Sequence, residues 1–356
     1  MTRRSITKSI SITFFILCLV FVVTWVKFLY TPLINEQQGY KYIVEPGTSL
    51  KAVINDLSFK GVVHYPRYML LLMRYRGDAP KLKAGEYLFP KGSTPSSMLQ
   101  QMVNATGLVY HAFTIIPGWN FKDVRHAFSK ENSLRHSLEQ MTDQEVMTYL
   151  GQPGVLPEGQ FYPDTYYFAP GTMDTVVLKR AFQAMQTKLY ASWTSRSVNL
   201  PYKNPGEALI IASLIEKEAY LNNERSMIAG VLINRLRKDM LLQVDPTVIY
   251  GMGLRYTGKI RKEDLQENTP YNTYVHKGLP PSPIAMPSLS SITAALHPEN
   301  TSYLYYVARG DGSHQFSDTY IEHQLAVVEA NTNNTNKIII GFFNENLIRH
   351  YLVKNF

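Results

Sequence analysis

This sequence of 356 residues contains a single cysteine and no cluster of histidines. The one cysteine, Cys18, excludes an intramolecular disulfide and, because it lies in an apolar stretch, leaves the rest of the chain without cysteine chemistry. The histidines are scattered and no His-Glu-x-x-His pattern occurs, so neither a metal nor any other cofactor is predicted. The only Ser-x-x-Lys pattern, Ser5 to Lys8, precedes the apolar stretch and does not support penicillin-binding chemistry.

Charge of one sign is not gathered into blocks either, although the formal net charge is +8. The basic residues do not cluster on one helix, and neither paired Cys-x-x-Cys knuckles nor an aromatic RNP stretch is present, so nucleic acid is not a predicted partner. An anionic surface or polymer, such as lipid or peptidoglycan, fits the charge better. The 45% apolar and 12% aromatic content is enough to fill the cores of two modest domains.

The N-terminus contains an uncharged, mostly apolar run from Ser9 to Val26, preceded by three basic residues: Arg3, Arg4 and Lys8. This length just crosses a bilayer, so we predict a cytoplasmic tail over 1–8 and a transmembrane helix over 9–30. The positive flank places the first residues in the cytoplasm and everything after about Tyr30 outside.

Two other interpretations of this segment fit less well. A cleaved signal peptide needs small residues at its end, whereas bulky ones stand there: Trp25, Phe28, Leu29 and Tyr30. Lipoprotein processing at Cys18 is disfavoured by the bulky Leu17 just before it.

A small α+β module is predicted over 40–107, after a polar linker over 31–39. Tyr40 to Val44 is typical of a strand, and a Pro-Gly turn leads to a helix that Thr48 or Ser49 can cap. A second strand follows over 84–89, and Thr94-Pro95 begins a helix running to about Val103. The module resembles a LysM-like domain through Tyr42, Val44, Gly47 and Leu50. Glycan binding and a role as a spacer both remain open.

The larger part, 108–330, alternates strand-like and helix-like stretches without a repeat, so we predict one α+β domain there. An Asn-rich tract then begins a tail over 331–356, whose composition is typical of a flexible extension.

One helix of this domain ends in a candidate catalytic residue. Asn204 and Pro205 supply its N-cap and first position, and residues 208–215 are apolar nearly all round, which predicts a buried helix. Glu218 continues the apolar stripe, whereas Glu216 turns away from it. A carboxyl leaving a buried apolar face should keep its proton near neutral pH, as a general acid requires. The alternative is a surface ion pair of Glu218 with Lys217 or Arg225.

Rigid loops rich in proline, glycine, amides and aromatic rings accompany this helix. Such loops suit a sugar polymer, whose rings offer apolar faces and hydroxyls, although each could be turn chemistry alone. They are Pro157 to Tyr166, Asn234 to Leu236, Gln243 to Gly251, Tyr271 to Tyr274 and Gly278 to Ile284.

With the Ala212-Ser213 and Glu216-Lys217-Glu218 patterns, these motifs identify a resemblance. From about Tyr40 to Ala330 the chain resembles the YceG-like (MltG) family of endolytic peptidoglycan transglycosylases. In that family's motif the second glutamate is catalytic, and it falls on Glu218. The resemblance further implies substrate-binding residues: Glu158, Asn234, Gln243, Asp245, Tyr250, Tyr271, Asn272 and Tyr274.

The resemblance implies a lyase that cleaves the MurNAc-GlcNAc bond of nascent glycan strands and leaves 1,6-anhydroMurNAc ends. Its catalytic domain would lie on the periplasmic or extracytoplasmic side of a bacterial inner membrane, with peptidoglycan synthases as neighbours. Two alternatives remain. One is a water-using muramidase in which Asp245 activates water opposite Glu218, and the other is a peptidoglycan-binding scaffold for synthases.

Overall fold

The computed structural model describes residues 3–45 and 47–330, so the tail over 331–356 and Pro46 of the expected turn lie outside it. The chain is a mixed α+β protein that divides into two compact units. The first comprises residues 1–113 with two short returns, 132–135 and 167–173, and the second comprises the rest. The boundary predicted at 107/108 differs from this division, and no local sequence pattern indicates the two returns.

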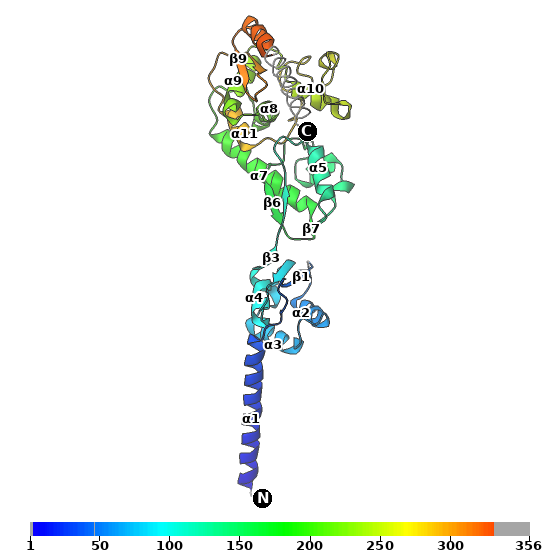
Figure 1. Cartoon of the computed structure of the whole chain (residues 1–356), viewed down its shortest axis with the longest axis vertical. Coiled ribbons are helices and arrows are strands. Elements are labelled where there is room, and N and C mark those ends of the chain that lie inside the picture. Colours follow the sequence, from blue (N-terminus) through cyan, green and yellow to red (C-terminus); the bar gives the residue numbers. More distant parts are fainter. Residues whose placement is uncertain (1–2, 46, 331–356) are drawn as a thin grey trace, which may run out of the picture. The chain divides into compact units, whose positions relative to one another are not determined.

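The first unit begins with α1 (Arg3–Tyr30), drawn in blue in Figure 1. Its segment Ile12–Tyr30 has a mean hydropathy of 2.5 and is almost entirely unburied. Within 3–45 and 47–330 it is the one helix long and apolar enough to cross a membrane. Its last turns are different, because Phe28 is only 6% exposed and belongs to the core of the first unit.

The segment expected to be a linker, 31–39, is also attached to this unit. Ile34 is buried, the Leu33 N–H donates to the Ser93 carbonyl at 2.7 Å, and the Gly92 N–H donates to the Ile34 carbonyl at 2.8 Å. The helix therefore enters the folded unit directly, without a free tether.

The rest of the first unit is a three-stranded antiparallel sheet in the order β1-β2-β3, with helices between the strands. Ser49 caps α2 and Thr94 caps α4, and Pro95 is the first residue of α4, all as predicted. The elements are β1 (Tyr40–Val44), α2 (Leu50–Phe59), α3 (Pro66–Arg76), η1 (Ala79–Lys81), β2 (Gly85–Phe89), α4 (Pro95–Asn104) and β3 (Leu108–Val109). The two returns contribute β5 (Leu134–Arg135), parallel to β7 (Thr172–Met173).

The second unit is mostly helical. Its helices are α5 (Phe121–Lys130), η2 (Leu138–Gln140), α6 (Asp143–Tyr149), α7 (Asp174–Thr194), α8 (Pro205–Glu218), η3 (Asn222–Glu224), α9 (Arg225–Arg237), α10 (Asp245–Met252), η4 (Gly253–Arg255), η5 (Asp264–Gln266) and α11 (Leu289–Leu296). Its strands β8 (Tyr305–Ala308) and β9 (His314–Ser317) form an antiparallel hairpin. Strand β4 (His111–Thr114) pairs with β6 (Thr165–Phe168).

Helix α8 is the centre of the second unit (Figure 1). As predicted, Asn204 caps it, Pro205 begins it, and every residue from Ala208 to Ile215 is buried. It packs against α7, α9, α10 and α11. A helix surrounded on all sides holds its last residue, Glu218, in a fixed place, and that is how the core positions the candidate site.

Candidate active site

Glu218 is the last residue of α8, where the helix leaves the core. Its side chain is partly exposed, and burial raises the pKa of the carboxyl to about 7. The negative charge of Asp245 adds to the rise, and a hydrogen bond with the Tyr306 hydroxyl opposes it. A carboxyl with this pKa holds a proton at neutral pH and can also give it up, which suits both halves of acid/base chemistry.

The expected alternative, an ion pair of Glu218 with Lys217 or Arg225, is wrong. The Lys217 ammonium donates to the Gly118 carbonyl at 3.3 Å, and the Arg225 guanidinium pairs with Glu216 at 2.9 Å. In the part of the chain that the structure describes, no cation forms an ion pair with Glu218. Its pKa is therefore not held down by a positive partner.

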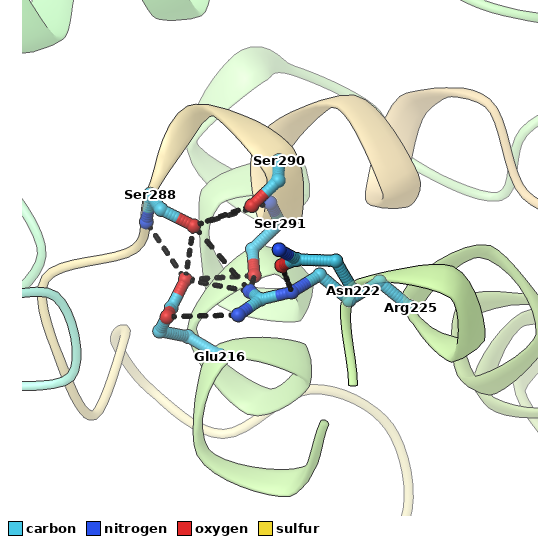
Figure 2. Close-up of polar contacts among 6 residues, drawn as sticks. All are labelled: Glu216, Asn222, Arg225, Ser288, Ser290 and Ser291. Atoms are coloured by element: carbon cyan, nitrogen blue, oxygen red, sulfur yellow. Dashed lines mark hydrogen bonds and ion pairs between the residues drawn. The ribbon is translucent and has the colours of Figure 1, made fainter. Parts of the chain in front are cut away.

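Glu216 lies in a separate network, shown in Figure 2. Its carboxylate accepts hydrogen bonds from the Ser288 N–H at 2.8 Å, the Ser288 hydroxyl at 2.5 Å and the Ser291 hydroxyl at 2.8 Å. These groups open helix α11, whose positive end favours a carboxylate. Burial alone would raise the pKa of Glu216, but the bonds from Arg225, Ser288 and Ser291 outweigh it and lower the pKa.

Tyr306, in strand β8, connects this strand to Glu218 and was not among the predicted site residues. Its hydroxyl is hydrogen-bonded to Glu218, and burial together with the nearby Glu218 charge raises the tyrosine pKa. The hydroxyl therefore stays protonated and donates. Tyr306 is 88 positions beyond Glu218 along the chain, so only an aromatic-rich stretch near 303–306 could have suggested it.

Buried Arg235 fastens this strand to the loop before α10. Its guanidinium donates to the carbonyls of Leu304 at 2.6 Å and Leu242 at 2.9 Å, and to Gln243 Oε1 at 3.2 Å. It also lies 5.1 Å from the centre of the Tyr305 ring. One side chain thus fixes β8, which carries Tyr306, and the loop that leads to Asp245. The sequence motif contained Arg235, but the predicted site did not include it.

Asn234, predicted to bind substrate, performs a neighbouring task in the structure. Its amide donates to the carbonyls of Thr301 at 2.7 Å and Tyr303 at 3.1 Å. One turn earlier, Gly230 lets the same loop approach, because a Cβ there would lie 2.7 Å from the Glu299 carbonyl oxygen. Helix α9 therefore holds the chain that leads into β8, and the sugar contact of Asn234 stays a prediction.

Gln243, Asp245 and Tyr274 lie on the exposed side of this cluster. Gln243 is exposed and adopts a left-handed φ of 53°, and its N–H donates to the Thr273 carbonyl at 3.1 Å. The Tyr274 hydroxyl donates to Asp245 at 2.5 Å. Burial raises the pKa of Tyr274, and the charges of Asp245 and Glu218 raise it further. Asp245 and Tyr274 therefore lie near Glu218, and Gln243 accepts a hydrogen bond from Arg235 at the edge of the same cluster.

Glu158, Tyr250 and Tyr271 form a second cluster. Both Glu158 oxygens accept the Phe121 N–H at 3.1 Å, and the Tyr250 hydroxyl donates to one of them at 3.0 Å. The ring centres of Tyr250 and Tyr271 lie 4.7 Å apart, and the Tyr271 hydroxyl is 2.8 Å from the Ser282 hydroxyl. Burial raises the pKa of Glu158 to about 7, although these hydrogen bonds oppose it.

The second cluster borders an open cavity of about 790 Å³. Glu158, Tyr250 and Tyr271 line it, and so does Lys217, which directly precedes Glu218. Glu218 itself is not part of the lining. The cavity therefore has aromatic rings, hydroxyls and charged groups on its walls, as binding of a polar polymer would require.

Asn272 is buried and its side chain is used within the protein. The amide nitrogen donates to three carbonyls of η5 and its flank, and the amide oxygen accepts the Tyr274 N–H at 2.9 Å. In this structure Asn272 shapes the loop that carries Tyr271 and Tyr274. Its predicted contact with substrate is not tested by these bonds.

Comparison with protein families gives a match to the YceG-like family over residues 42–329. An endolytic murein transglycosylase of Bacillus subtilis is 31% identical over 301 residues, which cover 80% of this chain and 82% of that protein. An endolytic murein transglycosylase of Streptococcus pneumoniae is 25% identical over 87% of this chain and 65% of its own length.

A solved structure agrees with the sequence matches. The crystal structure of a yceG-like protein from Listeria monocytogenes aligns with a TM-score of 0.53 and 26% identity. It covers 81% of this chain and 99% of the Listeria chain.

Proposed function

Because this chain belongs to the YceG-like family, we propose that it is an endolytic murein transglycosylase with Glu218 as its single general acid/base. The observation that carries the proposal is the carboxyl at the end of buried α8, whose pKa is raised to about 7 and which has no cationic partner among the described residues. The substrate class is peptidoglycan, the material on which the named relatives act.

The proposed reaction needs one carboxyl only. Protonated Glu218 gives its proton to the glycosidic oxygen as the bond from that oxygen to C1 of N-acetylmuramic acid breaks. The carboxylate then removes the proton of the C6 hydroxyl of the same sugar, and O6 bonds to C1. Atoms and charge balance without water, and the product carries a 1,6-anhydro end. The nucleophile is intramolecular, which gives it a high effective concentration.

The surroundings of Glu218 support both steps. The hydrogen bond from Tyr306 stabilises the carboxylate formed after the first proton transfer, whereas Asp245 and burial favour the protonated form before it. Asp245 also adds negative charge where positive charge develops at C1. We propose that the residues predicted to bind substrate contact the glycan: Glu158, Asn234, Gln243, Asp245, Tyr250, Tyr271, Asn272 and Tyr274. The hydrogen bonds of Asn234 and Asn272 also hold the neighbouring loops.

A water-using muramidase is the second candidate, and the position of Asp245 is what favours it. Its charge acts directly on Glu218, and hydrolases place two carboxyls around the bond that they cut. In that case Asp245 would activate water, and the products would have reducing ends. Against this, the Tyr274 hydroxyl already donates to Asp245 at 2.5 Å, which weakens it as a base.

We further propose that α1 anchors the chain in a bacterial inner membrane with the second unit on the outer side, near nascent strands and their synthases. The length and hydropathy of Ile12–Tyr30 support the anchor, and the basic residues before it support the orientation. The first unit places two helices between antiparallel β1 and β2, which supports a LysM-like module.

The deciding experiment is mass spectrometry of peptidoglycan after incubation with the full-length protein and with Glu218→Gln. Full length is needed because Phe28 and Ile34 belong to the core of the first unit. Anhydro-ended fragments that vanish in the variant are expected. Reducing ends would replace the transglycosylase with the muramidase, and intact strands with both proteins would favour a binding scaffold.

A further inference from the structure

Helix α3 has an outer face that the first unit does not cover. Its inner face is buried through Met69, Leu72 and Met73. On the outer side Tyr75 is 87% exposed and Leu71 is 45% exposed. Large apolar and aromatic side chains at this exposure, three to four residues apart on one helix, indicate a surface that contacts a membrane or another molecule.

This outer face is continuous with α1. Tyr68 lies one turn before Leu71. The centre of its ring is 5.5 Å from the ring centre of Phe28, 5.9 Å from that of Trp25 and 6.5 Å from that of Phe21. Tyr65 stacks on Tyr68 at 6.0 Å. Figure 1 shows α3 at the end of the first unit where α1 enters it.

The contacts with α1 set the depth of α3. A helix rises about 1.5 Å per residue, so the 19 residues Ile12–Tyr30 span about 28 Å, close to the ~30 Å hydrocarbon layer. Phe21 and Trp25 lie within this segment, and Tyr68 lies beside both. Trp25 comes five residues before the end of this segment, a rise of about 8 Å. These contacts therefore place Tyr68 in the outer part of the hydrocarbon layer, a short distance below the headgroups.

The residue types on this face match that level. Tyrosine rings are enriched where one side is apolar and the other is wet, and arginine extends its charge toward headgroups while its stem covers apolar surface. Arg67 and Arg74 are exposed on α3, and neither has an ion-pair partner among the described residues. Arg76 differs, because it pairs with Asp78 at 2.8 Å.

We propose that the outer face of α3, formed by Tyr65, Arg67, Tyr68, Leu71, Arg74 and Tyr75, lies in the outer leaflet and binds the headgroups of anionic lipids. The proposal rests on the membrane anchor of the proposed function. It adds that the first unit is clamped against the bilayer at two places, α1 and α3, and cannot swing freely on its anchor.

The test uses spin labels on the full-length protein in nanodiscs of phosphatidylethanolamine and phosphatidylglycerol, with Cys18→Ser as background. Labels at Tyr75→Cys and Leu71→Cys should be more accessible to oxygen than to an aqueous nickel chelate. A label at Ile43→Cys, 52% exposed on β1 in the same unit, is the matched control and should show the aqueous pattern. Val20→Cys, within the apolar segment, reports the anchor.

Aqueous patterns at positions 71 and 75 with a lipid pattern at 20 would overturn the proposal and leave the anchor standing. An aqueous pattern at all three would overturn both. Transglycosylase activity is measured separately and stands or falls with Glu218.

A charge reversal tests the headgroup contact. With the label at position 71, Arg74→Glu should lower the oxygen preference at least twofold in discs with phosphatidylglycerol. Lys51→Glu, an equal reversal at an exposed lysine of α2, should leave it unchanged. Equal effects of the two reversals would show that net charge alone acts and would refute recognition by this face.

Discussion

Glu216 and Glu218 are two residues apart on one helix, yet their surroundings give them opposite properties. Glu216 faces Arg225 and the start of α11, and its pKa is lowered. Glu218 faces Asp245 and Tyr306, forms no ion pair with a cation among the described residues, and has a pKa raised by burial to about 7. The comparison teaches that a helix end can carry a permanently charged structural carboxylate and a proton-exchanging one together, provided that successive faces meet different partners.

The largest expected effect comes from removing the proton-exchanging carboxyl. Glu218→Gln should reduce strand cleavage roughly 10²- to 10⁴-fold, the range for loss of a general acid/base. Cleavage rates on isolated peptidoglycan, with circular dichroism to verify folding, measure this. A folded variant that keeps more than a tenth of the activity would remove Glu218 from the proposed role.

The structural carboxylate should behave in the opposite way. Glu216→Gln leaves Arg225 buried without its counter-charge, which typically costs about 3 kcal/mol or more of unfolding free energy. Urea denaturation at pH 7 measures the loss. Activity per folded molecule should change much less than in Glu218→Gln. A near-wild-type midpoint would mean that the network in Figure 2 contributes little to stability.

The raised pKa of Glu218 should also make the free energy of unfolding depend on pH. The folded-state pKa of Glu218 is about 7 against 4.5 unfolded, so the folded state binds the extra proton between these values and stability falls as pH rises through that window. Glu218→Gln should remove this fall and gain roughly 1 to 3 kcal/mol above pH 7. Thermal denaturation at pH 4.5 and pH 8 tests it, and equal differences at both pH values would contradict the raised pKa.

Tyr306→Phe sharpens the comparison at the proton-exchanging site. Without the hydroxyl the carboxylate loses a hydrogen bond, so cleavage should slow about tenfold. The pKa of Glu218 should rise, and the fall of activity at alkaline pH should move to higher pH. Tyr305→Phe, which removes the hydroxyl of the preceding residue in β8, is the control and should leave the pH profile unchanged. A tenfold loss with an unmoved pH profile would indicate a merely structural role.

Asp245→Asn should give the smallest effect and the opposite shift. Removing the neighbouring negative charge lowers the pKa of Glu218, so the alkaline fall of activity should begin at lower pH. Rates across pH 5 to 9 measure it. Complete loss of cleavage at every pH would instead favour Asp245 as the base of a muramidase.

Local chemistry made much of this molecule predictable. Asn204, Pro205 and the apolar run to Ile215 specify a capped and buried helix, and its period places Glu218 on the apolar stripe. The caps at Ser49 and Thr94 and the apolar N-terminal helix follow from similarly short patterns. These features depend on neighbours within a few positions of each other.

What the sequence by itself determined, then, is the helix, its cap and the carboxyl at its end. Only the tertiary structure decided that Arg225 turns to Glu216, that Tyr306 from a strand 88 residues away reaches Glu218, and that Arg235 joins that strand to the loop before α10. It also decided that α3 lies against α1. Hydrogen bonds and burial between distant segments depend on how helices pack, and local periodicity does not contain that information.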